Sequence, residues 1–214
     1  MKQQKRILIS LSIIVLVVMG IWIFQLLQGN LPYVDKGTIL LVPWLVNSYF
    51  YEPFSLITNL GSSFFLYPFV VVVTILLFIW FRHWLPALFF GGGTYLTHKV
   101  NVFIKHLVER ERPSISVSLN AEGYSFPSGH AMVSIFCYGL LAYFITKKLK
   151  SKRAILTVQI SFTILIFLIG ISRYIINVHY LTDVLAGFFF GFLLLIGSIY
   201  LYEFIIKKRY PSKG

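Results

Sequence analysis

The sequence predicts an all-α integral membrane protein with six transmembrane helices, plus short interfacial helices between the first and second spans. Of its 214 residues, 57% are hydrophobic and only 12% are charged, about half the charged fraction of a typical soluble domain. The apolar residues gather into runs of the length that a helix needs to cross the hydrocarbon core. We therefore expect residues 1–214 to form a single membrane domain.

The first apolar run, residues 7–27, follows a basic segment and contains no charged residue. Its length and the lack of a small-residue cleavage site favour a retained span over a cleaved signal peptide. Five further spans are predicted, at residues 62–81, 84–104, 131–146, 154–171 and 182–206. The third contains Gly91-Gly92-Gly93, which would permit close helix packing.

Residues 29–60 do not contain a clean apolar run. Breaks at Gly29, Pro32 and Asp35 are followed by apolar residues interleaved with aromatic ones such as Trp44 and Tyr49. We expect short helices lying in the outer membrane interface, where aromatic rings act as anchors.

The formal charge of +12 does not indicate nucleic-acid binding, because the basic residues flank the apolar runs. With six spans, both termini, the 82–83 turn and the 147–153 loop share one side and hold 13 of the 19 Lys and Arg residues. The positive-inside bias predicts that this side is cytoplasmic and that the protein is a multi-pass plasma-membrane protein. The single cysteine, Cys137, is interpreted as a small buried apolar residue.

Two polar clusters fall on the predicted outer side. In the first, His98, Asn101, Lys105 and Arg112 follow helical spacing and would share one helix face. After Pro113 comes a polar loop with Ser114, Ser116, Ser118 and Asn120, and Ser128-Gly129-His130 then opens the fourth span.

The second cluster is residues 172–183, which join two apolar runs. If His179 and Asp183 are helical, they lie at i and i+4 on one face, so the carboxylate could orient the imidazole. Arg173 would present a fork-shaped guanidinium to an anion. The alternative is a structural His–Asp pair that joins two helices.

Together the clusters supply three cations, Lys105, Arg112 and Arg173, and only one evident carboxylate, Asp183. A multiply charged anion, and phosphate in particular, suits fork-shaped arginines and the helix N-terminal amides at Ser128-Gly129. No grouping has metal-ligand spacing, so we expect no metal and no other cofactor. Metal-independent phosphotransfer would use one histidine to attack phosphorus and the other to protonate the leaving oxygen.

Three motifs carry a family resemblance: Lys105-x6-Arg112-Pro113, Pro127-Ser128-Gly129-His130, and Ser172-Arg173-x5-His179-x3-Asp183. In type, order and membrane side they resemble the signature of the type 2 phosphatidic acid phosphatase family. The resemblance implies a metal-independent lipid phosphatase with His179 as nucleophile, Asp183 orienting it and His130 as general acid. It also implies that the phosphoryl group is bound by Lys105, Arg112, Ser128, Gly129 and Arg173.

The predicted function is hydrolysis of a lipid phosphate or diphosphate at the outer leaflet. Undecaprenyl diphosphate, slightly favoured, and phosphatidylglycerol phosphate are the expected substrates, and the oligomeric state is open. Two alternatives remain: a lipid phosphotransferase with the same site, and a lipid or anion transporter. The transporter is disfavoured because the polar residues lie on one side and no repeat is visible. For Arg110 the sequence leaves several roles open: phosphate binding, tuning of the entrance, or pairing with Glu109 or Glu111 at the interface.

Overall fold

The computed structural model describes residues 2–113 and 121–209, and in these ranges it contains helices and no β-strand. The helices are α1 (Lys2–Leu27), α2 (Tyr33–Thr38), α3 (Val42–Val46), α4 (Tyr51–Ile57), α5 (Ser63–Phe81), α6 (Trp84–Ala87), α7 (Gly93–Val108), α8 (Gly129–Thr146), α9 (Lys152–Ile175) and α10 (Leu181–Arg209). Most of the predicted polar loop, Ser114 to Asn120, lies outside the described residues.

Four helices in the described part of the chain are long and apolar enough to cross a membrane: α5, α8, α9 and α10. They coincide with the second, fourth, fifth and sixth predicted spans, which are thus helical and remain candidate spans. The third predicted span is α6, a π-helical turn at Leu88–Gly92 and α7, which follow one another without a break. The first predicted span, residues 7–27, lies within α1. That all six predicted spans cross a membrane stays a prediction.

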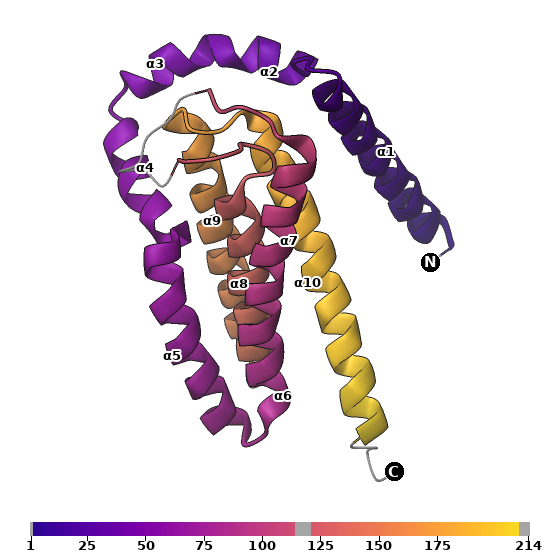
Figure 1. The fold of residues 1–214 in the computed structure, drawn as a ribbon. Helices are drawn as coiled ribbons and strands as arrows, with labels where there is room; N and C mark the ends of the chain where they lie inside the picture. Colours follow the sequence, from indigo (N-terminus) through magenta and orange to yellow (C-terminus); the bar gives the residue numbers. More distant parts are fainter. Residues whose placement is uncertain (1, 114–120, 210–214) are drawn as a thin grey trace.

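The segment between α1 and α5 consists of short helices, as expected. α2, α3 and α4 alternate with 3₁₀ turns at Ile39–Leu41 and Thr58–Gly61. They cross over one end of the bundle (Figure 1). Trp44 and Tyr49 are 65% and 100% exposed, which fits the predicted interfacial location without testing it.

The core of the bundle is α8, which packs against α7, α9 and α10 (Figure 1). Its contact with α10 is unusually close at two glycines. A Cβ on Gly187 would lie 2.6 Å from the carbonyl oxygen of Ser128, and one on Gly191 would lie 2.5 Å from that of Met132. Small residues at this spacing let two helix backbones approach, and here they bring the first turns of α8 and α10 together.

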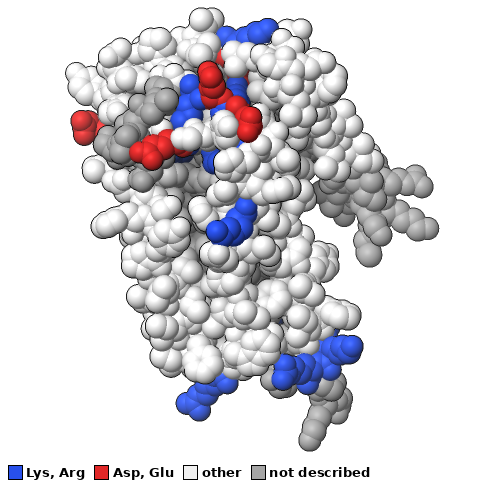
Figure 2. Space-filling model, in the orientation of Figure 1, with Lys and Arg blue, Asp and Glu red and all other residues white. Residues whose placement is uncertain are grey.

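Charged side chains occupy the two ends of the molecule. Figure 2 shows Lys and Arg gathered at the end near the C-terminus, a mixture of acidic and basic residues at the opposite end, and a largely uncharged surface between. The mixed end is where α7 finishes and α8 and α10 begin. Both polar clusters of the sequence therefore lie at the same end of the bundle.

One expectation about helical register is wrong, and one condition considered for the second cluster is not met. α7 ends at Val108, where Glu109 takes a left-handed conformation (φ 51°), so Arg112 is not on the helix face of His98, Asn101 and Lys105. α10 begins at Leu181, so His179 lies in the preceding turn and not in a helix with Asp183. In both cases the chain leaves the helix at a polar segment and tertiary contacts fix the side chains instead.

Candidate active site

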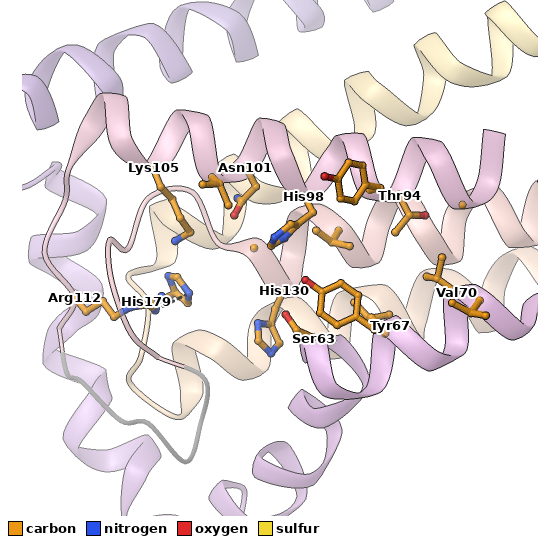
Figure 3. Close-up of a pocket in the computed structure, with 18 residues that line it drawn as sticks. Ser63, Tyr67, Val70, Thr94, His98, Asn101, Lys105, Arg112, His130 and His179 are labelled. Carbon is orange, nitrogen blue, oxygen red and sulfur yellow. Dashed lines mark hydrogen bonds between the residues drawn. The ribbon is translucent and has the colours of Figure 1, made fainter. Parts of the chain in front are cut away.

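A cavity of about 380 Å³ opens between α5 and α7 and reaches the mixed-charge end of the bundle. Five of the eight predicted site residues line it: Lys105, Arg112, Gly129, His130 and His179. Figure 3 shows Lys105, Arg112 and His179 at one end of the cavity, with His130 next along it. Further from this cluster the wall is formed by α5 and α7 (Figure 3), with Ser63, Tyr67, Val70, Thr94 and His98 among the lining residues.

His179 is presented to the cavity by a turn that follows α9. The carbonyl oxygen of Arg173 accepts hydrogen bonds from the amides of Val178 and His179, both at 3.1 Å. The imidazole is 3% exposed, and its two nitrogens have different partners. Nε2 lies 2.9 Å from a guanidinium nitrogen of Arg112, and Nδ1 lies 3.3 Å from Oδ2 of Asp183.

These partners define the tautomer of His179. A guanidinium can only donate, so Nε2 must be the acceptor and carries the lone pair. In the neutral ring Nδ1 then carries the proton and faces Asp183. Burial, and next the nearby cations Arg112 and Lys105, hold the pKa of His179 well below its usual 6.5. A neutral ring whose Nε2 lone pair faces the cavity, where Arg112 occupies it, is the form that a nucleophile requires.

Asp183 is fully buried and stands behind His179, outside the cavity wall. Its Oδ2 accepts from the hydroxyl of Ser125 and from the amide of Tyr180 at 3.0 Å, in addition to facing His179. Its Oδ1 accepts from Arg110 at 2.5 Å. Ser125 was not predicted, although its place two residues before the Pro127-Ser128-Gly129-His130 motif could have suggested it.

His130 lies in the first turn of α8 and projects into the cavity (Figure 3). It is 8% exposed, and its Nε2 has no hydrogen-bond partner within the part of the chain that the structure describes. Buried polar atoms in proteins are nearly always paired, so an imidazole of this kind facing a cavity is suited to exchanging a proton with a ligand.

The two cations on the cavity wall are held by backbone carbonyls. The ammonium of Lys105 donates to the carbonyl oxygens of Tyr124 and, at 3.2 Å, Ser125. Arg112 donates to the carbonyl oxygens of Gly123 at 3.0 Å and Val178 at 2.9 Å. Both cations therefore bind carbonyl oxygens of the loop that precedes α8, and Arg112 also binds one in the turn that carries His179.

Ser128 and Arg173 differ from expectation, because neither lines the cavity. The Ser128 hydroxyl is the N-cap of α8 and accepts from the amide of Ala131 at 3.4 Å. Arg173 is fully buried and donates to Thr58 at 2.9 Å. Both residues therefore lie behind the cavity wall, and their phosphate-binding role stays a prediction.

The expectation of a single carboxylate is also wrong. Asp35, in α2, is fully buried and accepts from Arg110 at 2.7 Å. An acidic residue in a largely apolar segment was the one signal that could have identified Asp35, but its partner Arg110 is 75 positions away. Arg110 likewise pairs with Asp35 and Asp183 rather than with Glu109 or Glu111 at the surface.

No group of three or more His, Cys, Asp or Glu side chains in residues 2–113 and 121–209 is arranged to hold a metal ion. The positive charge at the cavity comes from Lys105 and Arg112, with Arg173 behind them. The arrangement can bind an anionic group, attack it from Nε2 of His179 and transfer a proton at His130.

Comparison with known proteins gives consistent matches. The profile of the PAP2 superfamily matches residues 84–207. Phosphatidylglycerophosphatase B of Bacillus subtilis is 35% identical over 169 residues, covering 75% of this chain and 77% of the relative. Decaprenylphosphoryl-5-phosphoribose phosphatase of Mycolicibacterium smegmatis is 34% identical over 110 residues, which are 50% of this chain and 53% of that protein.

A solved structure has the same fold. The crystal structure of a transmembrane PAP2-type phosphatidylglycerolphosphate phosphatase from Bacillus subtilis matches with a TM-score of 0.75 and 28% identity, covering 92% of this chain and 98% of the other. The family resemblance drawn from the three motifs is thereby confirmed, and with it the enzyme class, a hydrolase of phosphate esters. The chain belongs to the PAP2 superfamily.

Proposed function

We propose that this protein hydrolyses lipid phosphates through a phosphohistidine formed on His179, without a metal ion. The observation that carries the proposal is the orientation of His179, whose Nε2 lone pair faces the cavity while Nδ1 faces Asp183. Lys105 and Arg112 on the cavity wall supply the charge that a metal ion would otherwise provide to the transferring group.

In the first step the substrate phosphoryl oxygens take over the donors of Arg112, which releases Nε2. Nε2 then attacks phosphorus, and the bond between phosphorus and the leaving oxygen breaks. Protonated His130 donates its proton to that oxygen. Asp183 stabilises the positive charge that develops on His179 through the Nδ1 proton.

In the second step a water molecule attacks the phosphohistidine. His130, now neutral, accepts the proton from this water, and the bond between phosphorus and Nε2 breaks. Inorganic phosphate leaves, and both histidines return to their starting protonation states. Transfer to an acceptor alcohol in place of water would make the protein a phosphotransferase, the alternative that the same site supports.

The lipid chain of the substrate would lie along the apolar part of the cavity, which contains Leu66, Val70 and Val71 of α5 and Val102 of α7. Phosphatidylglycerol phosphate is the proposed substrate, because it is the substrate named for the Bacillus subtilis relative and structure. A polyprenyl substrate such as undecaprenyl diphosphate is the second candidate. The similarity to a phosphatase of a decaprenyl lipid favours it.

We place the site at the outer face of the plasma membrane, with both termini in the cytoplasm. The argument is the distribution of basic residues, of which 13 of 19 flank the other face. The short helices α2 to α4 would then lie in the outer interface above the cavity.

The test is phosphate release by the purified protein in detergent from phosphatidylglycerol phosphate, undecaprenyl diphosphate and phosphatidic acid, with and without EDTA. We expect release to survive EDTA and phosphatidylglycerol phosphate to have the highest kcat/KM. Activity that EDTA abolishes and magnesium restores would refute the metal-independent route. Product analysis with added glycerol distinguishes the phosphotransferase, which would form glycerol phosphate in place of inorganic phosphate.

A further inference from the structure

Asp35 lies outside the three motifs and outside the matched family region, residues 84–207. Nevertheless it is fully buried, and the described hydrogen bonds of its side chain lead toward the active site. Its Oδ1 accepts from the amide of Thr182 at 3.0 Å. Its Oδ2 accepts from the Thr182 hydroxyl and from Arg110 at 2.7 Å. A buried carboxylate is stable only with such partners.

Arg110 connects Asp35 to Asp183. One of its terminal nitrogens donates to Asp35, and the other donates to Oδ1 of Asp183 at 2.5 Å and to the Thr182 hydroxyl at 2.9 Å. The guanidinium also lies 3.8 Å from the centre of the Tyr180 ring. A planar guanidinium that bridges two carboxylates and stacks on a ring has little freedom to rotate.

This arrangement decides which oxygen of Asp183 faces the nucleophile. The terminal torsion of an aspartate is broad and would by itself allow the carboxylate to turn. Because Arg110 holds Oδ1, Oδ2 is left to face Nδ1 of His179, with Ser125 and the Tyr180 amide as its other partners.

Asp35 also balances charge. Without it, Arg110 would be a buried cation paired with Asp183 alone and would draw the negative charge of Asp183 away from the imidazole. With it, the three groups carry a net negative charge next to Nδ1. That charge stabilises the positive charge that His179 develops on attack.

We propose that Asp35 and Arg110 are positioning residues that act on His179 through Asp183. The proposal rests on the proposed function of His179 as nucleophile. It makes the short helix α2, which precedes the matched family region, part of the catalytic apparatus.

The test is Asp35→Asn, which keeps the size and an acceptor for Thr182 but removes the charge. We expect kcat to fall about 10–100-fold, the cost of removing an outer partner of an oriented histidine in metal sites. KM should change little, because Lys105 and Arg112 still bind the phosphoryl group. Glu52→Gln is the matched control, since Glu52 is exposed in the neighbouring helix α4, and it should keep the wild-type rate.

The deciding measurement is the same substitution in the Asp183→Asn background. If Asp35 acts through Asp183, Asp35→Asn should then cost less than about twofold, whereas independent effects would multiply. An equal loss of kcat in both backgrounds, or a loss explained by a smaller folded fraction in a thermal melt, would overturn the proposal. So would an Asp35→Asn enzyme as active as wild type.

A second variant covers the case in which Asp35→Asn does not fold. Arg110→Lys keeps the charge but lacks the planar guanidinium whose two terminal nitrogens each hold one carboxylate. It should therefore show the same kcat-selective loss, again absent in the Asp183→Asn background. Wild-type activity of Arg110→Lys would contradict the proposal. Failure of the proposed function would look different, because the wild-type protein itself would release no phosphate from any lipid.

Discussion

The two histidines of the cavity should respond differently to substitution. His179→Ala removes the proposed nucleophile, so turnover should fall to background for every substrate. His130→Ala removes only proton donation to the leaving oxygen, a contribution of about 10²–10⁴-fold, or about 2.7–5.5 kcal/mol of the barrier. Asp183→Asn should fall between the two, because the imidazole stays in place but loses the charge that orients and stabilises it.

Among the described residues that line the cavity, His130 is the imidazole best placed to donate this proton. Its Nε2 faces the cavity without a partner in the described residues, while the ammonium of Lys105 is bound to two carbonyl oxygens. The cost of His130→Ala should therefore depend on the leaving group. A substrate with an alkoxide leaving group needs the proton, so His130→Ala should lose the full factor in rate on it. Nitrophenolate is a stable anion, so the rate on a nitrophenyl phosphate should fall by about tenfold or less.

The assay compares phosphate release from an alkyl phosphate and an aryl phosphate of similar size, for each variant. His83→Ala, at the opposite end of the bundle, controls for loss of a histidine as such and should keep both rates. If the aryl phosphate rescues His179→Ala but not His130→Ala, the two roles have been assigned in reverse. If neither variant distinguishes the substrates, His130 is not the proton donor.

Three further predictions concern topology, pH and packing. Tyr49→Cys should react with a membrane-impermeant maleimide in intact cells, and Lys150→Cys should not. The native Cys137 is buried and should not interfere with the labelling. The opposite labelling pattern would show that the topology is inverted. Because the pKa of His179 is lowered, the nucleophile stays neutral on mild acidification, so kcat/KM should fall only as pH drops well below 6.5; an acid limb at or above 6.5 would contradict this. Gly187→Ala places a Cβ 2.6 Å from a backbone oxygen of α8 and should destabilise the protein by about 1–3 kcal/mol in a thermal melt, whereas Gly197→Ala, with no atom within 4 Å, should not.

The motif residues were predictable because their chemistry is local. A histidine, an arginine and an aspartate between two apolar runs are costly unless they are used, and this identified His179, Arg173 and Asp183 before any contact was known. The same reasoning located the four long apolar helices, since hydrophobic length alone decides whether a helix can span a bilayer.

The orientation of the site residues was not predictable in the same way. Arg112 was expected on the helix face of Lys105, and a helical His179 was considered, yet both lie in irregular backbone held by backbone carbonyls. Helical spacing could not detect this, because the chain leaves the helix at Glu109 and again before Leu181, and periodicity carries no information beyond a helix end.

The sequence by itself determined the membrane class, the types of the candidate site residues and their common end of the bundle, because hydropathy, charge placement and motif chemistry are properties of short segments. Only the tertiary structure decided that Ser128 caps α8, that Arg173 donates to Thr58 and that Asp35 reaches Asp183 through Arg110. Those contacts join residues up to 115 positions apart. They depend on how closely α8 and α10 approach at Gly187 and Gly191 and on where α2 crosses the bundle, which no local pattern specifies.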